Sequence, residues 1–270
     1  MLAHWTGVLL ARRAPRGEHA GLLAALGLTQ AQLTQPDAHI GHEAACTLWE
    51  RLTHDAPSDF GARFSEELPL ASLGLLGYLV SASATVDDAL ARVVRYNTLI
   101  KRPRTLTALR LPGALSLIEM PPARARPWPA QLTDALLAAY VTFAARLTRT
   151  PVRAARVRVI HAPPPRPDLV AAVYGCPVEY HAEVNELVLP AEVLRRTICG
   201  HDPQLLTYLE PLAAAAADPD DELERVRRFL ATTLSSGKLP SLAAAARAVA
   251  TSPRTQIGRA SCRERVSSPV

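Results

Sequence analysis

A change of hydrophobic period between residues 85 and 120 constrains the fold more than any other feature of the sequence. Thr85 followed by Asp88 is typical of a capping box, which begins a helix by satisfying free backbone N–H groups. Behind it, side chains recur at helical spacing at Val86, Leu90, Val93, Val94 and Asn97. Residues 105–111 and 114–120 instead alternate, and the Pro-Gly pair between them predicts a β-hairpin. The chain therefore combines helices with antiparallel strands.

Further segments repeat this mixture of helices and strands. The sequence predicts helices over 17–28, 29–33, 41–55, 131–149 and 168–175, and strands over 152–160, 177–183 and 185–190. In the 41–55 helix, one face carries Ala44, Leu48, Trp49 and Leu52. The last two strands are expected to form a hairpin that turns at Val184 and Asn185. We therefore expect an α+β fold, with a helix-rich domain and a small antiparallel sheet, and not a doubly wound parallel one.

Composition adds limits to this picture. About half of the residues are apolar, which suffices for a sizeable core, and aromatic residues make up only 5%, which favours helices. No apolar run reaches the roughly 20 residues that cross a bilayer, and the amino terminus lacks the order of a secretory signal, so we expect a cytoplasmic protein without a membrane partner. The cysteines are scattered, which indicates neither a disulfide framework nor a zinc ribbon: Cys46, Cys176, Cys199 and Cys262.

The net charge of +5 is weak support for a nucleic-acid partner. The last fifteen residues carry Arg259, Arg263 and Arg265 against Glu264, so they contribute two of the five charges. A net charge this small is common in proteins that never bind nucleic acid.

The segment from Asp218 to Thr255 predicts a helix, a turn and a second helix, with a third helix beginning. The first helix opens with an acidic turn that suits its dipole, and one face carries Leu223, Val226, Leu230 and Leu234. Ser252 is a candidate N-cap, with Pro253 at the first position of the third helix.

Three separated blocks of sequence resemble one family. The run KLPSLAAAARAVATSPRT is similar to the first helix-turn-helix of AraC/XylS-type transcription regulators. Upstream, LGLLGYLVSASATVDDALARVVRY and RVRVIHAPPPRPDLVAAVYGCPVEYHAEVNELVLPAEVLRR resemble the arabinose-binding-like amino-terminal domain of one branch of that family. The resemblance implies an effector-sensing α+β domain over 1–215 and the start of an all-α helix-turn-helix domain over 216–255.

The last part of the chain departs from the family pattern. Where the recognition helix should continue, residues 256–270 lack an apolar helical period and contain Gly258. We interpret this tail as non-native and the helix-turn-helix domain as truncated. We expect the 270-residue chain to give no sequence-specific shift of promoter DNA, since a recognition helix needs a couple of anchored turns.

The resemblance also nominates site residues. Ser252 would cap the recognition helix, and Arg254 and Thr255 would face DNA. The alternative, which the truncation favours, is a frayed and solvated helix end. For the effector, the residues near the junction of helix and hairpin are candidates to line a pocket: Tyr78, Arg95, Tyr96 and Lys101. Against this, an arginine such as Arg95 is more often a solvated helix residue, and a tyrosine such as Tyr96 more often core.

Enzyme and metal chemistry have little support. Asp87 and Asp88 are adjacent and so point apart on a helix, which suits capping better than acid–base catalysis. His39 with His42, and Cys199 with His201, lack a second pair at usable spacing for a metal. We therefore predict no enzyme, catalytic residue, metal or cofactor.

Two functions remain. The first is a ligand-responsive bacterial regulator whose partners are promoter DNA and a small-molecule effector, with a homodimer left open. The second is a stand-alone ligand-binding or dimerisation module that does not bind DNA.

Overall fold

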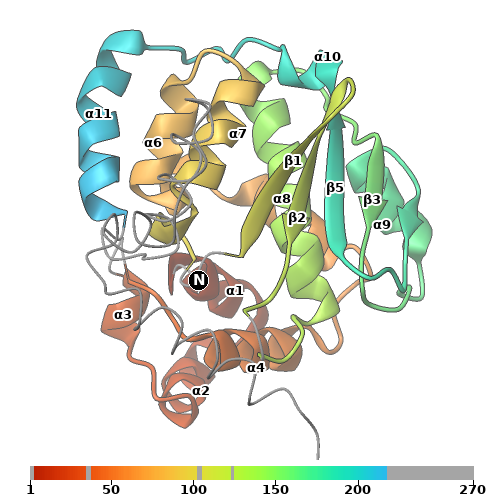
Figure 1. Cartoon of the computed structure of the whole chain (residues 1–270). Helices are drawn as coiled ribbons and strands as arrows, with labels where there is room; N and C mark the ends of the chain where they lie inside the picture. Colours follow the sequence, from red (N-terminus) through yellow and green to blue (C-terminus); the bar gives the residue numbers. More distant parts are fainter. Residues whose placement is uncertain (1–2, 35–37, 102–104, 123–124, 218–270) are drawn as a thin grey trace, which may run out of the picture. The chain divides into compact units, whose positions relative to one another are not determined.

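A five-stranded sheet in the order β1-β2-β5-β3-β4 packs against a set of helices (Figure 1). The computed structural model describes residues 3–34, 38–101, 105–122 and 125–217, all within one unit. Its strands are β1 (Leu106–Leu111), β2 (Ala114–Glu119), β3 (Arg156–Arg158), β4 (Val178–Glu179) and β5 (Asn185–Pro190). Its α-helices are α1 (Ala3–Arg13), α2 (His19–Ala25), α3 (Gln30–Thr34), α4 (His42–Thr53), α5 (Phe60–Arg63), α6 (Leu75–Ala82), α7 (Val86–Arg95), α8 (Ala130–Thr148), α9 (Pro167–Tyr174), α10 (Ala191–Leu194) and α11 (Pro203–Ala216). Short 3-10 helices cover Arg16–Glu18, Phe64–Glu67, Leu70–Leu73 and Asn97–Leu99. The α+β prediction is confirmed.

Helix α7 begins at the predicted capping box. The Asp88 backbone N–H donates to Thr85 Oγ1 at 3.2 Å, and the Thr85 hydroxyl donates to Asp88 Oδ2 at 2.9 Å. The face of the helix that is turned inward carries Val86, Ala89, Leu90 and Val93. In α4 the expected face is also buried at Leu48, Trp49 and Leu52. Local sequence signals therefore decide where these helices begin and which sides they bury.

Strands β1 and β2 form the predicted hairpin. They pair antiparallel from Leu106 opposite Glu119 to Leu111 opposite Ala114. Gly113 in the turn has φ +70°, a left-handed conformation that glycine adopts without a steric penalty. The hairpin joins the rest of the sheet through β2, which pairs antiparallel with β5.

The prediction that residues 177–190 form a hairpin is wrong. Strand β3 lies between β4 and β5: Val157 pairs antiparallel with Leu187 on one side and parallel with Val178 on the other. Asn185 is not a turn residue. It is the first residue of β5, it is 3% exposed, and its side-chain oxygen accepts from the backbone N–H of Ile160 at 3.0 Å.

The sheet is consequently mixed and not purely antiparallel. Two parallel neighbours need a crossover connection, and α9, which lies between β3 and β4 in the chain, provides it. After β4 the chain stays beside the segment that extends β3, because Ala182 N–H donates to the Val159 carbonyl at 2.9 Å. His181 N–H likewise donates to the His161 carbonyl at 3.1 Å, so this segment lies beside the residues that follow β3 before β5 begins.

Helix α8 covers one face of the sheet and is the longest described helix (Figure 1). Its residues are mostly buried, and it packs against α4, α5 and β5. The approach to α5 is close enough that a Cβ added to Gly61 would lie 2.1 Å from the Gln131 carbonyl oxygen. No described helix has the length and apolarity needed to span a membrane.

Helix α11, the last described element, buries few of its side chains. It begins at Asp202, whose side chain accepts from Leu205 N–H at 2.9 Å, and it packs against α6. Ala213 is the only buried residue of this helix, and large apolar side chains are exposed at Leu205, Tyr208 and Leu212.

Candidate functional site

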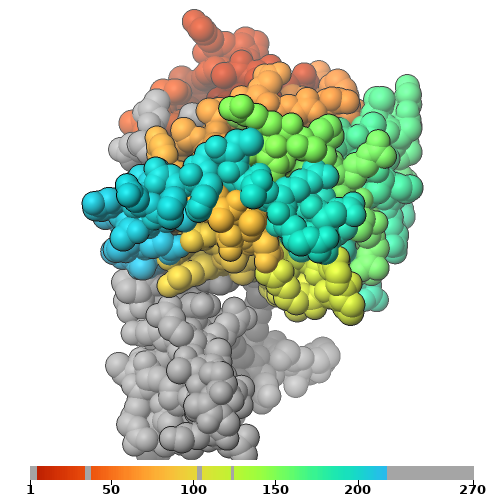
Figure 2. Space-filling view, turned by 90° about the horizontal axis from the view of Figure 1, so that it is seen from above, coloured from red at the N-terminus to blue at the C-terminus, as the bar shows by residue number. Residues whose placement is uncertain are grey.

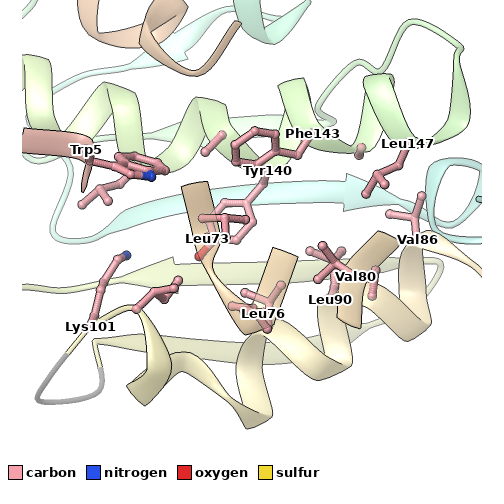
Figure 3. Close-up of a pocket in the computed structure, with 16 residues that line it drawn as sticks. Trp5, Leu73, Leu76, Val80, Val86, Leu90, Lys101, Tyr140, Phe143 and Leu147 are labelled. Atoms are coloured by element: carbon pink, nitrogen blue, oxygen red, sulfur yellow. The ribbon is translucent and has the colours of Figure 1, made fainter. Parts of the chain in front are cut away.

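A cavity lies between α6, α7 and α8, with Trp5 of α1 at one end (Figure 3). Its walls are lined by Trp5, Leu73, Leu76, Val80, Val86, Ala89, Leu90, Val93, Ile100, Lys101, Leu136, Ala139, Tyr140, Phe143, Ala144 and Leu147. The space that the centres of water molecules can occupy is about 80 Å³. One water needs about 10–15 Å³ by that measure, so the cavity holds several and is large enough for a small organic molecule.

The polar groups of the lining gather around one buried carboxylate. Glu119 ends β2 and is 0% exposed. Its Oε1 atom accepts from Lys101 Nζ and from the Tyr140 hydroxyl, each at 2.5 Å, and its Oε2 accepts from the Thr105 hydroxyl at 3.1 Å. We call Lys101, Glu119 and Tyr140 the buried triad.

The buried triad is electrically neutral and its members hold one another in place. The Lys101 and Glu119 side chains are 9% and 1% exposed, so each charge depends on the other for compensation. Removing one partner of such a pair typically costs about 3–5 kcal/mol, because the other charge stays buried. Burial, together with the charge of Glu119 and the hydrogen bond to it, raises the pKa of Tyr140 well above its ordinary value. The Tyr140 hydroxyl therefore keeps its proton at neutral pH and donates it in the hydrogen bond to Glu119.

Trp5 supplies a further donor. It is 5% exposed, and its indole nitrogen is buried without a hydrogen-bond partner. The ring is fixed by Phe64, whose centroid lies 5.9 Å away. A buried N–H without a partner is uncommon, and a bound molecule is one of the ways in which such a group is satisfied.

The three residues expected to contact a ligand do not line this cavity. Tyr78 on α6 is 56% exposed. Tyr96 is 2% exposed, but its hydroxyl donates to Glu210 of α11, and Arg95 lies 3.8 Å from the same carboxylate. Lys101, named with them on sequence grounds, does line the cavity.

Arg95 and Tyr96 instead belong to a contact between α7 and α11. Arg92 Nε donates to Glu210 Oε1 at 2.8 Å, beside the Tyr96 hydroxyl on Oε2. Burial, followed by the hydrogen bond to Glu210, raises the pKa of Tyr96 to about 12. We call Arg92, Arg95, Tyr96 and Glu210 the Glu210 cluster.

Sequence reasoning missed Trp5, Glu119 and Tyr140. One signal was available for Glu119, because it continues the strand face of Leu115 and Leu117, where an apolar residue is expected. A carboxylate at a buried strand position needs partners. The sequence alone does not say that Lys101 and Tyr140 provide them.

A second buried polar pair lies outside the cavity lining. His161 Nε2 lies 3.3 Å from Asp134 Oδ1, and the Asp134 carbonyl accepts from the Tyr174 hydroxyl at 3.2 Å. Burial raises the pKa of Asp134 against the opposing effect of His161. Burial lowers the pKa of His161, but the hydrogen bond and charge of Asp134 outweigh it, so the pKa of His161 lies above its ordinary value. The pair ties α8 to the chain that follows β3.

The other sequence candidates have structural partners or lie elsewhere. Asp87 binds Arg110 at 2.7 Å, and Asp88 is committed to the helix cap. Within the described residues, no three His, Cys, Asp or Glu side chains are grouped so that they could hold a metal ion. The proposed DNA-binding residues Ser252, Arg254 and Thr255 lie outside the described part of the chain.

Comparison with known proteins identifies relatives of this fold. The family model for the arabinose-binding domain of AraC transcription regulators, an amino-terminal domain, matches residues 17–198. Among solved structures, the transcriptional regulator CdpR from Pseudomonas aeruginosa is similar with a TM-score of 0.50 and 17% sequence identity, over 87% of this chain and 74% of that chain. At that identity the likeness concerns the fold alone. No curated protein sequence matches the chain.

Proposed function

Because the chain belongs to the AraC transcription regulators that carry an amino-terminal arabinose-binding domain, we propose that it is a ligand-responsive regulator whose effector binds in the cavity between α6, α7 and α8. The single observation that carries this proposal is the cavity itself. It is mostly apolar, it has a few convergent polar groups at one end, and it is large enough for a small molecule. Its location inside the matched domain supports a sensing role.

A route from the cavity to the rest of the protein runs through α7. Val93 on this helix lines the cavity, and its neighbour Arg92 binds Glu210 of α11. Helix α11 leads directly into residue 218 and the segment similar to a helix-turn-helix. A ligand that moves α7 would therefore change how firmly α11 is held, which is a differential interaction of the kind that allostery requires.

The output of the regulator is proposed to be DNA binding. Residues 1–215 would form the sensor, and 216–255 would begin the helix-turn-helix domain. Ser252 would cap its recognition helix, with Arg254 and Thr255 facing DNA. This part of the proposal rests on the sequence resemblance and on the family.

Filling the cavity tests the sensing role. The chain is screened against sugars, amino acids, organic acids and neutral apolar compounds for a rise in Tm, because a ligand of the native state stabilises it. Ala139 lines the cavity, so A139L places three extra carbon atoms inside it. We expect each effector candidate to lose at least tenfold in affinity in A139L. The control is A91L on the exposed side of α7, which should leave affinity unchanged.

The outcomes separate the possible functions. Compounds that bind A139L as tightly as the unchanged chain would show that the cavity is not the sensor site. A reporter driven by the native promoter then tests the output. A cavity ligand that never changes transcription would instead favour a ligand-binding module that does not act on DNA.

A further inference from the structure

The polar groups of the cavity limit what it can bind. Apart from Trp5, Lys101 and Tyr140, every described residue of the lining has a purely hydrocarbon side chain. Lys101 and Tyr140 both donate to the same oxygen of Glu119. The charge of Lys101 and the O–H of Tyr140 are thus satisfied within the protein.

Trp5 is different from these two residues. Its indole N–H is buried and lacks a partner, and Figure 3 shows the ring at the end of the cavity where Lys101 also lies. Among the described lining residues it alone lies outside the region 17–198 that the family model matches. The unpartnered indole N–H therefore comes from α1, which lies outside the matched region.

A sugar fits this arrangement poorly. A pentose carries four hydroxyl groups, and most would be buried against hydrocarbon walls. Each buried hydroxyl without a partner weakens binding by about tenfold or more. The name of the matched domain therefore does not describe the chemistry of this cavity.

An ionised acid also fits poorly. Lys101, the one cationic side chain among the described residues of the lining, already binds Glu119 at 2.5 Å. A carboxylate placed beside them would add a second negative charge to a neutral pair in a buried site, and like charges there repel strongly.

We propose that the effector is a neutral, mainly hydrocarbon molecule of about eight non-hydrogen atoms, whose single acceptor oxygen binds the N–H of Trp5. This inference rests on the proposed function, because it takes the cavity as the effector site. It goes further by naming the chemical class of the ligand and the residue that selects it.

Three probes of similar size test the ligand class. They are 2-heptanone, its anionic isostere hexanoate, and L-arabinose, each titrated into the full 270-residue chain and followed by NMR of the backbone and indole N–H groups. We expect 2-heptanone to bind most tightly. One indole N–H signal should shift, and it should be the signal that disappears in Trp5→Phe.

A matched pair of variants tests the hydrogen bond. Trp49 also has a buried, unpartnered indole N–H and also packs against Phe64, at 4.9 Å, but it does not line the cavity. Trp5→Phe should weaken 2-heptanone binding by about threefold to tenfold, the usual value of one neutral hydrogen bond. Trp49→Phe should leave the affinity unchanged.

Each result has a distinct meaning. Tighter binding of hexanoate or L-arabinose, lost in A139L, would overturn the inference and leave the cavity as the sensor site. No binding of any probe, or equal 2-heptanone affinity in Trp5→Phe, would also overturn it. The proposed function fails separately, if every ligand found in the wider screen ignores A139L.

Discussion

Replacing Glu210 by alanine should release α11 while leaving the sensor core intact. The carboxylate accepts from Arg92 at 2.8 Å and from the Tyr96 hydroxyl, and the Arg92 and Glu210 side chains are 22% and 28% exposed. Hydrogen bonds to charged groups contribute about 1.5–3 kcal/mol, and partial exposure favours the low end. We therefore expect a loss of about 2 kcal/mol, which is roughly a 30-fold change in the ratio of docked to undocked α11.

Native-state hydrogen exchange measures this directly. In E210A the amides of 207–216 should exchange about 30-fold faster, because local opening of α11 becomes easier. The amides of α8 should be unchanged, since Glu210 does not contact that helix in any described interaction. The matched control is Gln204→Ala, which changes an exposed residue on the same helix.

Two results would refute the reasoning behind E210A. Unchanged exchange in α11 would mean that its apolar contacts with α6 hold it without the Glu210 cluster. A parallel increase in α8 would mean that α11 and the core open as one unit, so that α11 is not a separately movable element.

Three further predictions concern the core. Lys101→Met or Glu119→Leu alone should lower the free energy of unfolding by about 3–5 kcal/mol in urea titrations, whereas the double variant should recover most of the loss, because neither charge is left unpaired. His161→Gln should cost most stability below the ordinary pKa of histidine. The folded-state pKa is raised, so this contribution is lost as pH rises through it, and the difference in urea midpoint between the two proteins should shrink as the pH is raised above that ordinary pKa. Gly77→Ala should destabilise by about 1–3 kcal/mol, since a Cβ there would lie 2.0 Å from a backbone oxygen, while Gly21→Ala on α2, with open space around it, should stabilise slightly in thermal unfolding.

Local signals predicted several of the helices and the first hairpin, whereas α1 and the long-range strand pairing were missed. The capping box at Thr85 and the turn at Gly113 act over a few residues, so the sequence displays them directly. The position of β3 beside β5 depends on Val157 meeting Leu187, thirty residues along the chain. Nothing within either strand encodes that neighbour, whereas the short link from β4 to β5 suggested a hairpin.

The functional site shows the same division. The sequence placed Arg95, Tyr96 and Lys101 near the junction of helix and hairpin, and in the structure they lie between α7 and β1 or at the end of α7. Lys101 then binds Glu119, whereas the Tyr96 hydroxyl binds Glu210, which lies 114 residues further along the chain. Tyr96 caps the end of α7, whereas Lys101 follows the 3-10 helix Asn97–Leu99, so the two side chains reach different surfaces. Which surface meets the cavity depends on packing partners that are remote in sequence.

On α7, Val93 lines the cavity while Arg92 binds Glu210 of α11. This division of the helix makes a quantitative demand on the proposed mechanism. If occupancy of the cavity changes the docking of α11 by some factor, then the docking of α11 must change ligand affinity by that same factor, because coupling between two equilibria is reciprocal. E210A removes about 2 kcal/mol of docking, and its effect on ligand affinity therefore cannot exceed the shift in α11 exchange that the ligand causes in the unchanged chain. A ligand that leaves α11 exchange untouched must also bind E210A unchanged. In that case the signal would have to leave the sensor through another element. The nearest alternative is β1, at the edge of the sheet beside α7 (Figure 2), because Arg110 on β1 forms an ion pair with Asp87 on α7.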